Sequence, residues 1–188
     1  TTEHTADLVL NTTPVNALVQ MMKPNAPQEI IDHSQAMKHR SMVFVFAIID
    51  RDRITHDHWI YIPEASLTVH RLSEFKNFSE ECAPPGKTMV CCEITCDFED
   101  EVWNKSDDEL RKIAIKDLVD IGLIKQEEAL HTFTWRERYA YPLYTLDYQD
   151  HMNAVLDWVE GLEGIQTTGR QGLFLSLIHI SEPTRQPC

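Results

Sequence analysis

The sequence predicts a mixed α/β fold in which helices cover a β-sheet. Apolar runs with the length of strands alternate with segments whose apolar residues recur at helical spacing. With 43% hydrophobic and 25% charged residues, the chain can also bury a core. The expected order of elements is β-α-α-β-β-β-β-α-β-α, followed by a short strand near residues 165–168.

The chain opens with an expected strand, a tight turn and a helix. Leu8-Val9-Leu10 is apolar and stops at Asn11-Thr12-Thr13-Pro14. Thr13 is expected to cap a helix that begins at Pro14 and runs to about Met22. Ligands of open α/β sheets bind where strand ends meet helix starts. This turn is therefore either a binding turn or an ordinary joint between a strand and a helix.

A second helix and three strands are expected next. Pro27 opens a helix that runs to about Lys38. Residues 42–49 are apolar on both faces, which predicts a central strand covered on both sides. Residues 58–62 form the next expected strand, and in residues 66–72 apolar and polar side chains alternate as in a half-buried strand.

Arg71 is the informative residue of that alternating segment, because it shares a face with Leu67 and Val69. A guanidinium on an apolar face is costly to bury without an anionic partner. One explanation is a buried ion pair with Glu74 or Glu93. The other is an arginine that faces a phosphate or carboxylate of a ligand, whose oxygens its forked guanidinium matches.

The second half of the chain adds two expected strands and two amphipathic helices. An apolar strand covers residues 88–96, and a capping box at residues 106–109 opens a helix that Gly122 ends. Residues 132–144 are extended in character and rich in side chains that line pockets. Asp147 is expected to cap the last helix.

Charge and cysteine content disfavour several classes of partner. The formal net charge is −13, which disfavours nucleic acids and anionic membrane surfaces. No apolar run reaches about 18 residues, so no membrane span is expected. Cys91, Cys92 and Cys96 lie in an apolar run and are interpreted as small buried residues of a reducing compartment. We therefore expect a cytoplasmic protein.

Patterns of hydrolases and of metal sites are absent from the sequence. His56 and His58 could seed a metal site, but no third ligand is identifiable, and exposed loop histidines are the simpler interpretation. There is no G-x-S-x-G, no Ser/His/Asp order, no paired-carboxylate pattern and no G-x-G-x-x-G. We therefore expect no metal ion, and no catalytic residue is nominated.

Three segments, taken in order and with their spacing, resemble one family of flavin enzymes. Residues 59–64 with 71–78 resemble the substrate-domain sheet of FAD-dependent amine oxidases and protoporphyrinogen oxidases, to which UDP-galactopyranose mutase is related. Residues 139–144 resemble the Tyr-Pro segment that precedes the last helix there. The run Thr-Thr-Gly-Arg-Gln-Gly-Leu-Phe at 167–174 resembles the closing flavin motif. The resemblance covers about residues 7–174.

The resemblance implies a domain organisation. Residues 1–40 would be a remnant of a Rossmann-like FAD-binding domain with a connecting helix. Residues 41–146 would form a substrate-binding domain, a mixed β-sheet with covering helices. Residues 147–174 would be the last helix and the start of the C-terminal motif that contacts FAD.

The resemblance also implies a cofactor, a substrate and the residues that contact them. The expected FAD contacts are Gly169, Arg170, Gln171 and Gly172 of the closing motif, and Thr12, Thr13 and Pro14 of the first turn. Glycines let a backbone approach a cofactor closely, and Arg170 would supply positive charge, unless it forms only a surface salt bridge. A small organic substrate would be contacted by Arg71, Trp59 and Tyr141.

The sequence departs from the family at both ends. The glycine-rich loop of the FAD-binding half is absent, so we expect the chain to be a C-terminal part of a longer enzyme and inactive by itself. Residues 175–188 match the in-frame translation of a transposon-end adapter used in sequencing libraries. We expect this tail to be non-native.

The leading hypothesis is therefore part of an FAD-dependent oxidoreductase that acts on a small organic substrate. An alternative within the same fold is a flavin-dependent isomerase similar to UDP-galactopyranose mutase. The segment 71–78 favours the mutase, whereas Gln171, where the mutases have leucine, disfavours it. A further alternative is a non-enzymatic α/β binding module.

Overall fold

The computed structural model describes residues 2–176, which form two compact units. Unit 1 contains the residues up to His39 and those from Tyr141 onward, and unit 2 is Arg40–Ala140. The order of helices and strands is the predicted one, with a short extra helix after the last strand and three 3-10 turns between elements. The mixed α/β fold class is thus confirmed.

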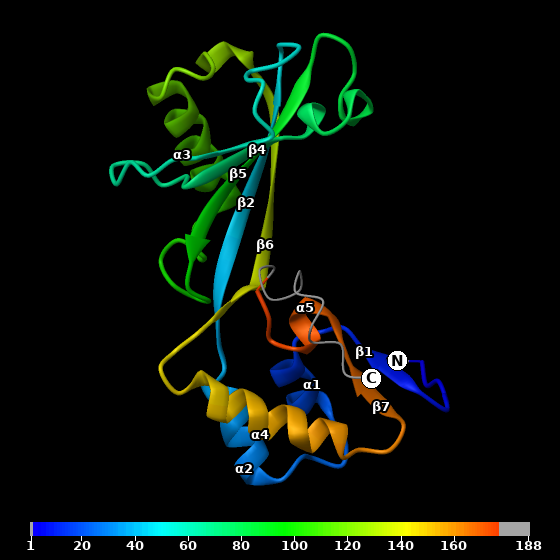
Figure 1. The fold of residues 1–188 in the computed structure, drawn as a ribbon. Coiled ribbons are helices and arrows are strands. Elements are labelled where there is room, and N and C mark those ends of the chain that lie inside the picture. The colour runs from blue at the N-terminus through cyan, green and yellow to red at the C-terminus, as the bar shows by residue number, and fades with distance from the viewer. Residues whose placement is uncertain (1, 177–188) are drawn as a thin grey trace. The chain divides into compact units, whose positions relative to one another are not determined.

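Unit 2 is built on a five-stranded sheet with the strand order β3-β4-β5-β2-β6 (Figure 1). The pairs β3–β4, β4–β5 and β2–β5 are antiparallel. Parallel pairing occurs only in the separate two-stranded sheet of the described residues, so the expectation of a mixed sheet in the substrate-binding domain is corrected to an antiparallel one. The five strands are β2 (Lys38–Ile49), β3 (Trp59–Tyr61), β4 (Arg71–Glu74), β5 (Thr88–Cys96) and β6 (Ala129–Leu143).

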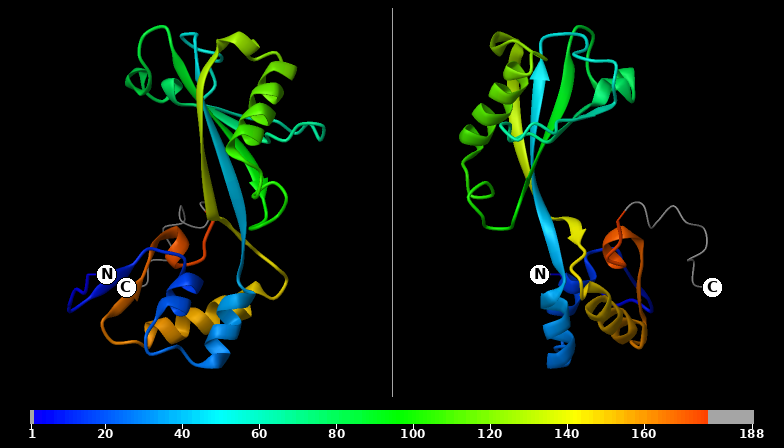
Figure 2. Two further views of the ribbon diagram at one scale, coloured as in Figure 1. Left: turned by 180° about the vertical axis from the view of Figure 1, so that it is seen from behind. Right: turned by 60° about the vertical axis from the view of Figure 1, so that its left-hand side comes forward.

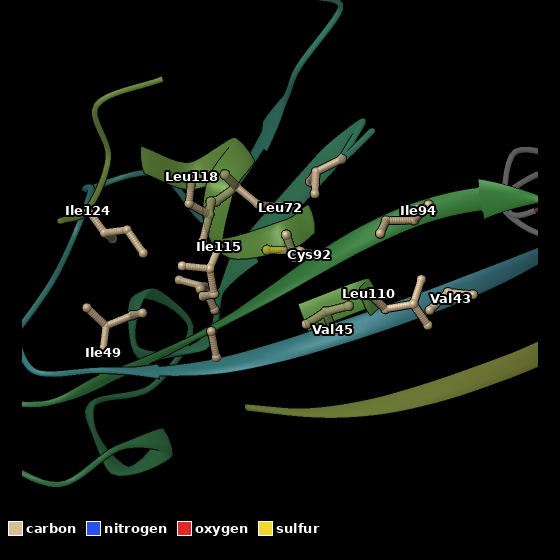
Figure 3. Packing of buried hydrophobic residues seen from close by; sticks show 14 of the residues in the cluster. Val43, Val45, Ile49, Leu72, Cys92, Ile94, Leu110, Ile115, Leu118 and Ile124 are labelled. Carbon is tan, nitrogen blue, oxygen red and sulfur yellow. The ribbon is translucent and has the colours of Figure 1, made fainter. Parts of the chain in front are cut away.

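Helix α3 (Asp107–Asp120) covers one face of this sheet and closes the core of unit 2 (Figure 3). Every second residue of β2 points to that face, from Val43 to Ile49, and meets Leu110 and Leu118 of the helix. Burial of such side chains contributes roughly 1.5–3 kcal/mol each, which holds helix and sheet together. The predicted capping box is confirmed, because Ser106 Oγ accepts from the Glu109 amide.

The opposite face of β2 is covered less than predicted. Phe44, Phe46 and Ile48 are half-buried, whereas the residues between them are fully buried. The prediction of a strand buried on both faces is therefore wrong. The α-helix α3 packs on one face of this sheet, and the other face is shielded in part by Phe133 of β6 and by Phe75 of a 3-10 turn, both of which stack on Phe46.

The strand predicted at 66–72 is also wrong in its first half, because β4 begins only at Arg71. The cause is the buried carboxylate of Asp117 in α3. Its Oδ2 accepts hydrogen bonds from the amides of Thr68 and Val69, at 2.8 and 2.9 Å. Because these two amides donate to the carboxylate, they are not available for hydrogen bonds to a neighbouring strand, and β4 begins only after them.

Unit 1 combines a two-stranded parallel sheet with packed helices (Figure 2). The strands β1 (Val9–Asn11) and β7 (Ile165–Thr167) pair in register, and α2 packs against α1 and α4. Its core contains Val15, Val19, Met37, Val155, Val159 and Phe174. The helices are α1 (Val15–Met21), α2 (Gln28–Ala36), α4 (Tyr148–Glu160) and α5 (Gly169–Gly172).

Two predicted helix caps are not formed by their side chains. Pro14 occupies the cap position of α1, and the Thr13 hydroxyl instead donates to Asn11 Oδ1 at 2.6 Å. Asp147 does precede α4 but makes no side-chain cap bond, because its carboxylate accepts from the Thr145 hydroxyl at 2.7 Å. In both places a nearby polar group competes with the helix end for the side chain.

Two further expectations concern the tail and the membrane. Most of the tail interpreted as non-native, residues 177–188, lies outside the described residues. The Leu175 amide donates to the Arg170 carbonyl at 2.8 Å.

Within residues 2–176, no helix has both the length and the apolar character that crossing a membrane requires.

Candidate functional site

One candidate site lies in unit 1, where β1 and β7 end together. Because the strands are parallel and Asn11 is opposite Thr167, both carboxyl ends lie at the same edge. Each strand leads directly into a helix, β1 into α1 and β7 into α5. In open α/β sheets, ligands bind at this edge.

Asn11 holds this edge together. Its side chain is buried, and its Nδ2 donates to the Thr13 carbonyl and to Thr167 Oγ1, both at 3.0 Å. Its Oδ1 accepts from the amide and the hydroxyl of Thr13. The Thr168 amide donates to the Asn11 carbonyl at 2.9 Å. Asn11 was not nominated from the sequence, although asparagine at the start of a turn is a known signal of such a structure.

The two glycines of the closing motif serve different purposes. Gly169 has φ of +76°, a conformation that favours glycine, and a Cβ there would meet nothing within 4 Å. At Gly172 a Cβ would lie 2.8 Å from Thr167 Oγ1 and 3.0 Å from the Asn11 carbonyl oxygen. Gly169 thus leaves open space beside the backbone, and Gly172 allows α5 to pack closely on the strand ends.

Arg170 and Tyr141, two of the nominated residues, lie together in unit 1. The guanidinium carbon of Arg170 lies 5.5 Å from the centre of the Tyr141 ring, which is a cation–π contact. Both side chains are half-buried. The contact restricts the orientation of the guanidinium, so a positive charge is held next to the glycines of the motif.

Phe174 closes the motif inside the core of unit 1. It is buried, with the edges of the His39 and Tyr144 rings packed on it. The Tyr144 hydroxyl donates to the Phe174 carbonyl at 3.3 Å and accepts from the Ser176 amide at 2.8 Å. Burial raises the pKa of Tyr144, so its phenol remains protonated and remains a donor. The end of the motif is thereby fixed.

A separate candidate site is the face of the unit 2 sheet opposite α3, here called the open face. Residues directly opposite in an antiparallel pair share a face. The register therefore places Tyr61, Arg71, Glu93 and Phe44 in one row across four strands. The next row holds Trp59, Ser73, Cys91 and Phe46.

An ion pair lies at the centre of the open face. Arg71 donates from Nε to Glu93 Oε1 at 2.9 Å and from Nη2 to Glu93 Oε2 at 2.6 Å. Glu93 is 5% exposed, and the guanidinium also lies over the Tyr61 ring at 5.6 Å. The expectation of an ion pair is confirmed with Glu93. Glu74 instead accepts hydrogen bonds from the Ile54 and Thr55 amides and from the Thr88 hydroxyl.

Aromatic side chains surround this ion pair. Trp59 and Trp135 are 55% and 62% exposed, and Tyr61 is exposed as well. Phe133 stacks on Phe46 with ring centres 4.6 Å apart. Tyr61, Phe133 and Trp135 were not nominated from the sequence. Their alternation along β3 and β6 is the signal that could have identified them.

The Cys91 thiol on the open face does not act as a nucleophile near neutral pH. Burial and, to a smaller extent, the Glu93 carboxylate raise the pKa of Cys91 to about 12. Cys91 therefore remains a neutral thiol near neutral pH, which suits its interpretation as a small buried residue. Burial also lowers the pKa of His70, which keeps that imidazole neutral.

The nominated residues thus fall into two sets. Trp59 and Arg71 share the open face of unit 2. Gly169, Arg170, Gln171 and Gly172 lie in unit 1 with Tyr141 and with the turn of Thr12, Thr13 and Pro14. Within unit 1, the turn and the motif meet through Asn11.

The fold is shared with solved structures of oxidoreductases and of a mutase. The chain matches a reduced UDP-galactopyranose mutase over 88% of its own length and 36% of that chain, with TM-score 0.73 and 18% identity. It matches a putative protoporphyrinogen oxidase from Exiguobacterium sp. 255-15 over 88% and 36%, with TM-score 0.67 and 20% identity. A putrescine oxidase double mutant matches over 87% and 37%, with TM-score 0.60 and 17% identity.

These likenesses establish a shared fold, and the protein classes are those that the sequence segments resemble. The chain spans little more than a third of the length of each of these proteins. No protein-family model and no curated protein sequence matches the chain.

Proposed function

We propose that this chain is the C-terminal part of an FAD-dependent oxidoreductase of the amine oxidase and protoporphyrinogen oxidase type. The observation that carries the proposal is the position of the closing motif. Gly169 and Arg170 directly follow β7, at the edge where the two parallel strands end. The shared fold with a protoporphyrinogen oxidase and a putrescine oxidase supports the same class.

The residues present fit a cofactor with a flat ring system and a pyrophosphate. Gly169 leaves space next to the backbone, and Arg170 offers a restrained positive charge in a chain whose formal net charge is −13. Thr12, Thr13 and Pro14 form the neighbouring turn, which Asn11 ties to the motif. Gln171, which follows Arg170, would contact the cofactor with them.

The cofactor would supply the hydride-accepting chemistry, as cofactors of this kind do. The chain's own residues would bind and orient. Arg170 would offset negative charge of the cofactor, and Tyr141 would hold Arg170 in place through the cation–π contact. Trp59 and Arg71 would contact a small organic substrate through the open face, where Glu93 fixes the direction of the guanidinium.

A second candidate is a flavin-dependent mutase acting on a UDP-sugar. The match to a reduced UDP-galactopyranose mutase, with TM-score 0.73, favours it. Arg71 is central to this candidate too, since a guanidinium suits phosphate oxygens. The third candidate, a binding module without catalysis, keeps the fold and requires no flavin.

The test is to express a longer chain that includes the upstream reading frame, with and without Arg170→Ala. We expect the longer protein to purify yellow with a flavin spectrum, and the variant to retain several-fold less flavin. Arg111→Ala, a change at an exposed arginine of α3, is the control and should retain as much as the wild type.

Three outcomes separate the candidates. A longer protein that stays colourless after FAD is added supports the binding module and contradicts both flavin proposals. Turnover of a UDP-sugar only under reducing conditions supports the mutase. Oxidation of an amine or a porphyrinogen supports the oxidoreductase. The 188-residue chain itself should show no turnover.

A further inference from the structure

Helices α2 and α4 of unit 1 bring two imidazoles into direct contact, away from the closing motif. The Nδ1 atoms of His33 and His151 lie 2.8 Å apart, and the ring centres lie 5.0 Å apart. Both residues are half-buried and line one pocket of about 390 Å³ together with Glu29 and Asp32. None of these four residues takes part in the proposed flavin or substrate contacts.

A contact of 2.8 Å between two imidazole nitrogens is a hydrogen bond in which one Nδ1 donates and the other accepts. Asp147 Oδ2 lies 3.4 Å from Nε2 of His151, one helical turn earlier in the chain. A carboxylate in this position favours the proton on Nε2, which makes the Nδ1 of His151 the acceptor and the Nδ1–H of His33 the donor. A carboxylate behind an imidazole is the usual support of a metal-binding histidine.

We propose that His33 and His151 bind a divalent transition-metal ion such as Zn²⁺ through their Nδ1 atoms. Zinc lies about 2.0–2.1 Å from each imidazole nitrogen, so two tetrahedral ligands are about 3.3 Å apart. To admit the ion, the two nitrogens separate by about 0.5 Å, and the Nδ1 proton of His33 moves to its Nε2 or is released to water so that this nitrogen can bind as well. Imidazole nitrogens favour zinc, copper and nickel over the hard cations calcium and magnesium.

The remaining coordination positions would be filled by water. The described part of the chain contains no group of three or more His, Cys, Asp or Glu side chains arranged to hold a metal ion. The site is therefore a two-nitrogen site, with the carboxylates of Glu29 and Asp32 along the wall of the same pocket. The formal net charge of −13 further attracts a cation.

Calorimetric titration of the 188-residue protein with ZnCl₂, under reducing conditions at pH 7.5, tests the proposal. We expect one saturable site per chain. His33→Gln and His151→Gln should each weaken binding by at least about tenfold, and Asp147→Asn by about tenfold, as outer partners of metal ligands do.

Two controls test the exposed histidine pair near β3 and one exposed thiol as other zinc ligands. The exposed pair His56 and His58 is changed in the double variant His56→Gln/His58→Gln, and the exposed thiol in Cys82→Ser. Both controls should keep wild-type affinity. Unchanged binding in His33→Gln and His151→Gln, or loss of binding in either control, means an adventitious ion only and overturns the proposal, as does the absence of a saturable site.

A measurement on the wild type guards against variants that fail to fold. The imidazole nitrogen signals of His33 and His151 are followed by NMR as Zn²⁺ is added. Both Nδ1 signals should shift together and saturate at one equivalent. Signals that do not move rule the site out, whatever the variants show.

Discussion

At the scale of single residues, the two glycines of the closing motif are required for different reasons, one for its backbone conformation and the other for its lack of a side chain. Gly169 needs its positive φ, and Gly172 needs its missing side chain. Gly169 therefore leaves room beside the backbone, and Gly172 allows the chain to pack on itself. The packing role of Gly172 can be measured through the stability of the protein without any ligand.

Gly172→Ala should destabilise the protein by about 1–3 kcal/mol, because the added methyl group would overlap Thr167 Oγ1 and the Asn11 carbonyl. Gly161→Ala is the matched control. Its Cβ would meet atoms only at 3.4 Å and beyond, and its φ of −75° suits alanine. We expect that control to change stability by less than about 1 kcal/mol. Urea unfolding of both variants gives the comparison, and equal losses would contradict it.

The Arg71–Glu93 ion pair makes a second prediction at this scale. Arg71→Leu leaves the buried Glu93 carboxylate without its partner and should cost stability near the lower end of about 3–5 kcal/mol. The side chain of Arg71 is 26% exposed, so solvent can reach the vacated position and reduce the loss. The double variant Arg71→Leu/Glu93→Leu should recover most of that loss, since no unpaired charge remains. A double variant as unstable as the single one would refute this, as measured by urea unfolding.

At the scale of elements, α3 does more than cover the sheet. Through Asp117 it also determines where β4 begins, since two backbone amides 48 and 49 residues away in sequence bind its carboxylate. The strand and the helix are therefore coupled by a side chain as well as by apolar contact. Arg71 lies two residues after Val69, so its position depends on the same carboxylate.

Asp117→Ala should destabilise unit 2 by about 1–3 kcal/mol, because the amide of the buried Val69 loses its acceptor, whereas solvent can reach the amide of the exposed Thr68. Asp120→Ala on the same helix is the control. It removes only an exposed ion pair with Lys116 and should cost less than about 1 kcal/mol. Thermal unfolding followed by circular dichroism compares them, and similar losses in both variants would contradict the role of Asp117.

The sequence predicts the order of the elements because periodicity is a local signal, carried by runs such as 42–49. Local signals fail where another polar side chain, distant or in the same turn, captures a backbone or side-chain donor. Asp117 does so at Thr68, and Asn11 takes the hydroxyl of Thr13 within its own turn. The ion pair of Arg71 is predictable from its face, but the choice of Glu93 over Glu74 depends on the register of β4 and β5.

At the scale of the whole molecule, each unit has its own hydrophobic core. The core that contains Val43 and Leu118 lies within unit 2, and the core that contains Val19 and Val155 lies within unit 1. Cores that share no residues can lose stability separately. The chain is therefore expected to depart from a single two-state transition.

Leu118→Ala should destabilise unit 2 by about 2–5 kcal/mol, because the side chain is fully buried in that core. Hydrogen exchange measured by mass spectrometry should then speed up in β5 and α3. Amides of α4 in unit 1 should keep the exchange rates of the wild type. Equal acceleration in α4 would show that the two units unfold as one.

The exposed aromatic residues of the open face give the protein an optical reporter. Of the four tryptophans, Trp59 and Trp135 are exposed, whereas Trp103 and Trp158 are half-buried. Emission from the first two should be red-shifted and readily quenched by acrylamide. A molecule that settles on this face should shift that emission to the blue and protect it from the quencher. Fluorescence can therefore screen candidate substrates before any turnover is measured.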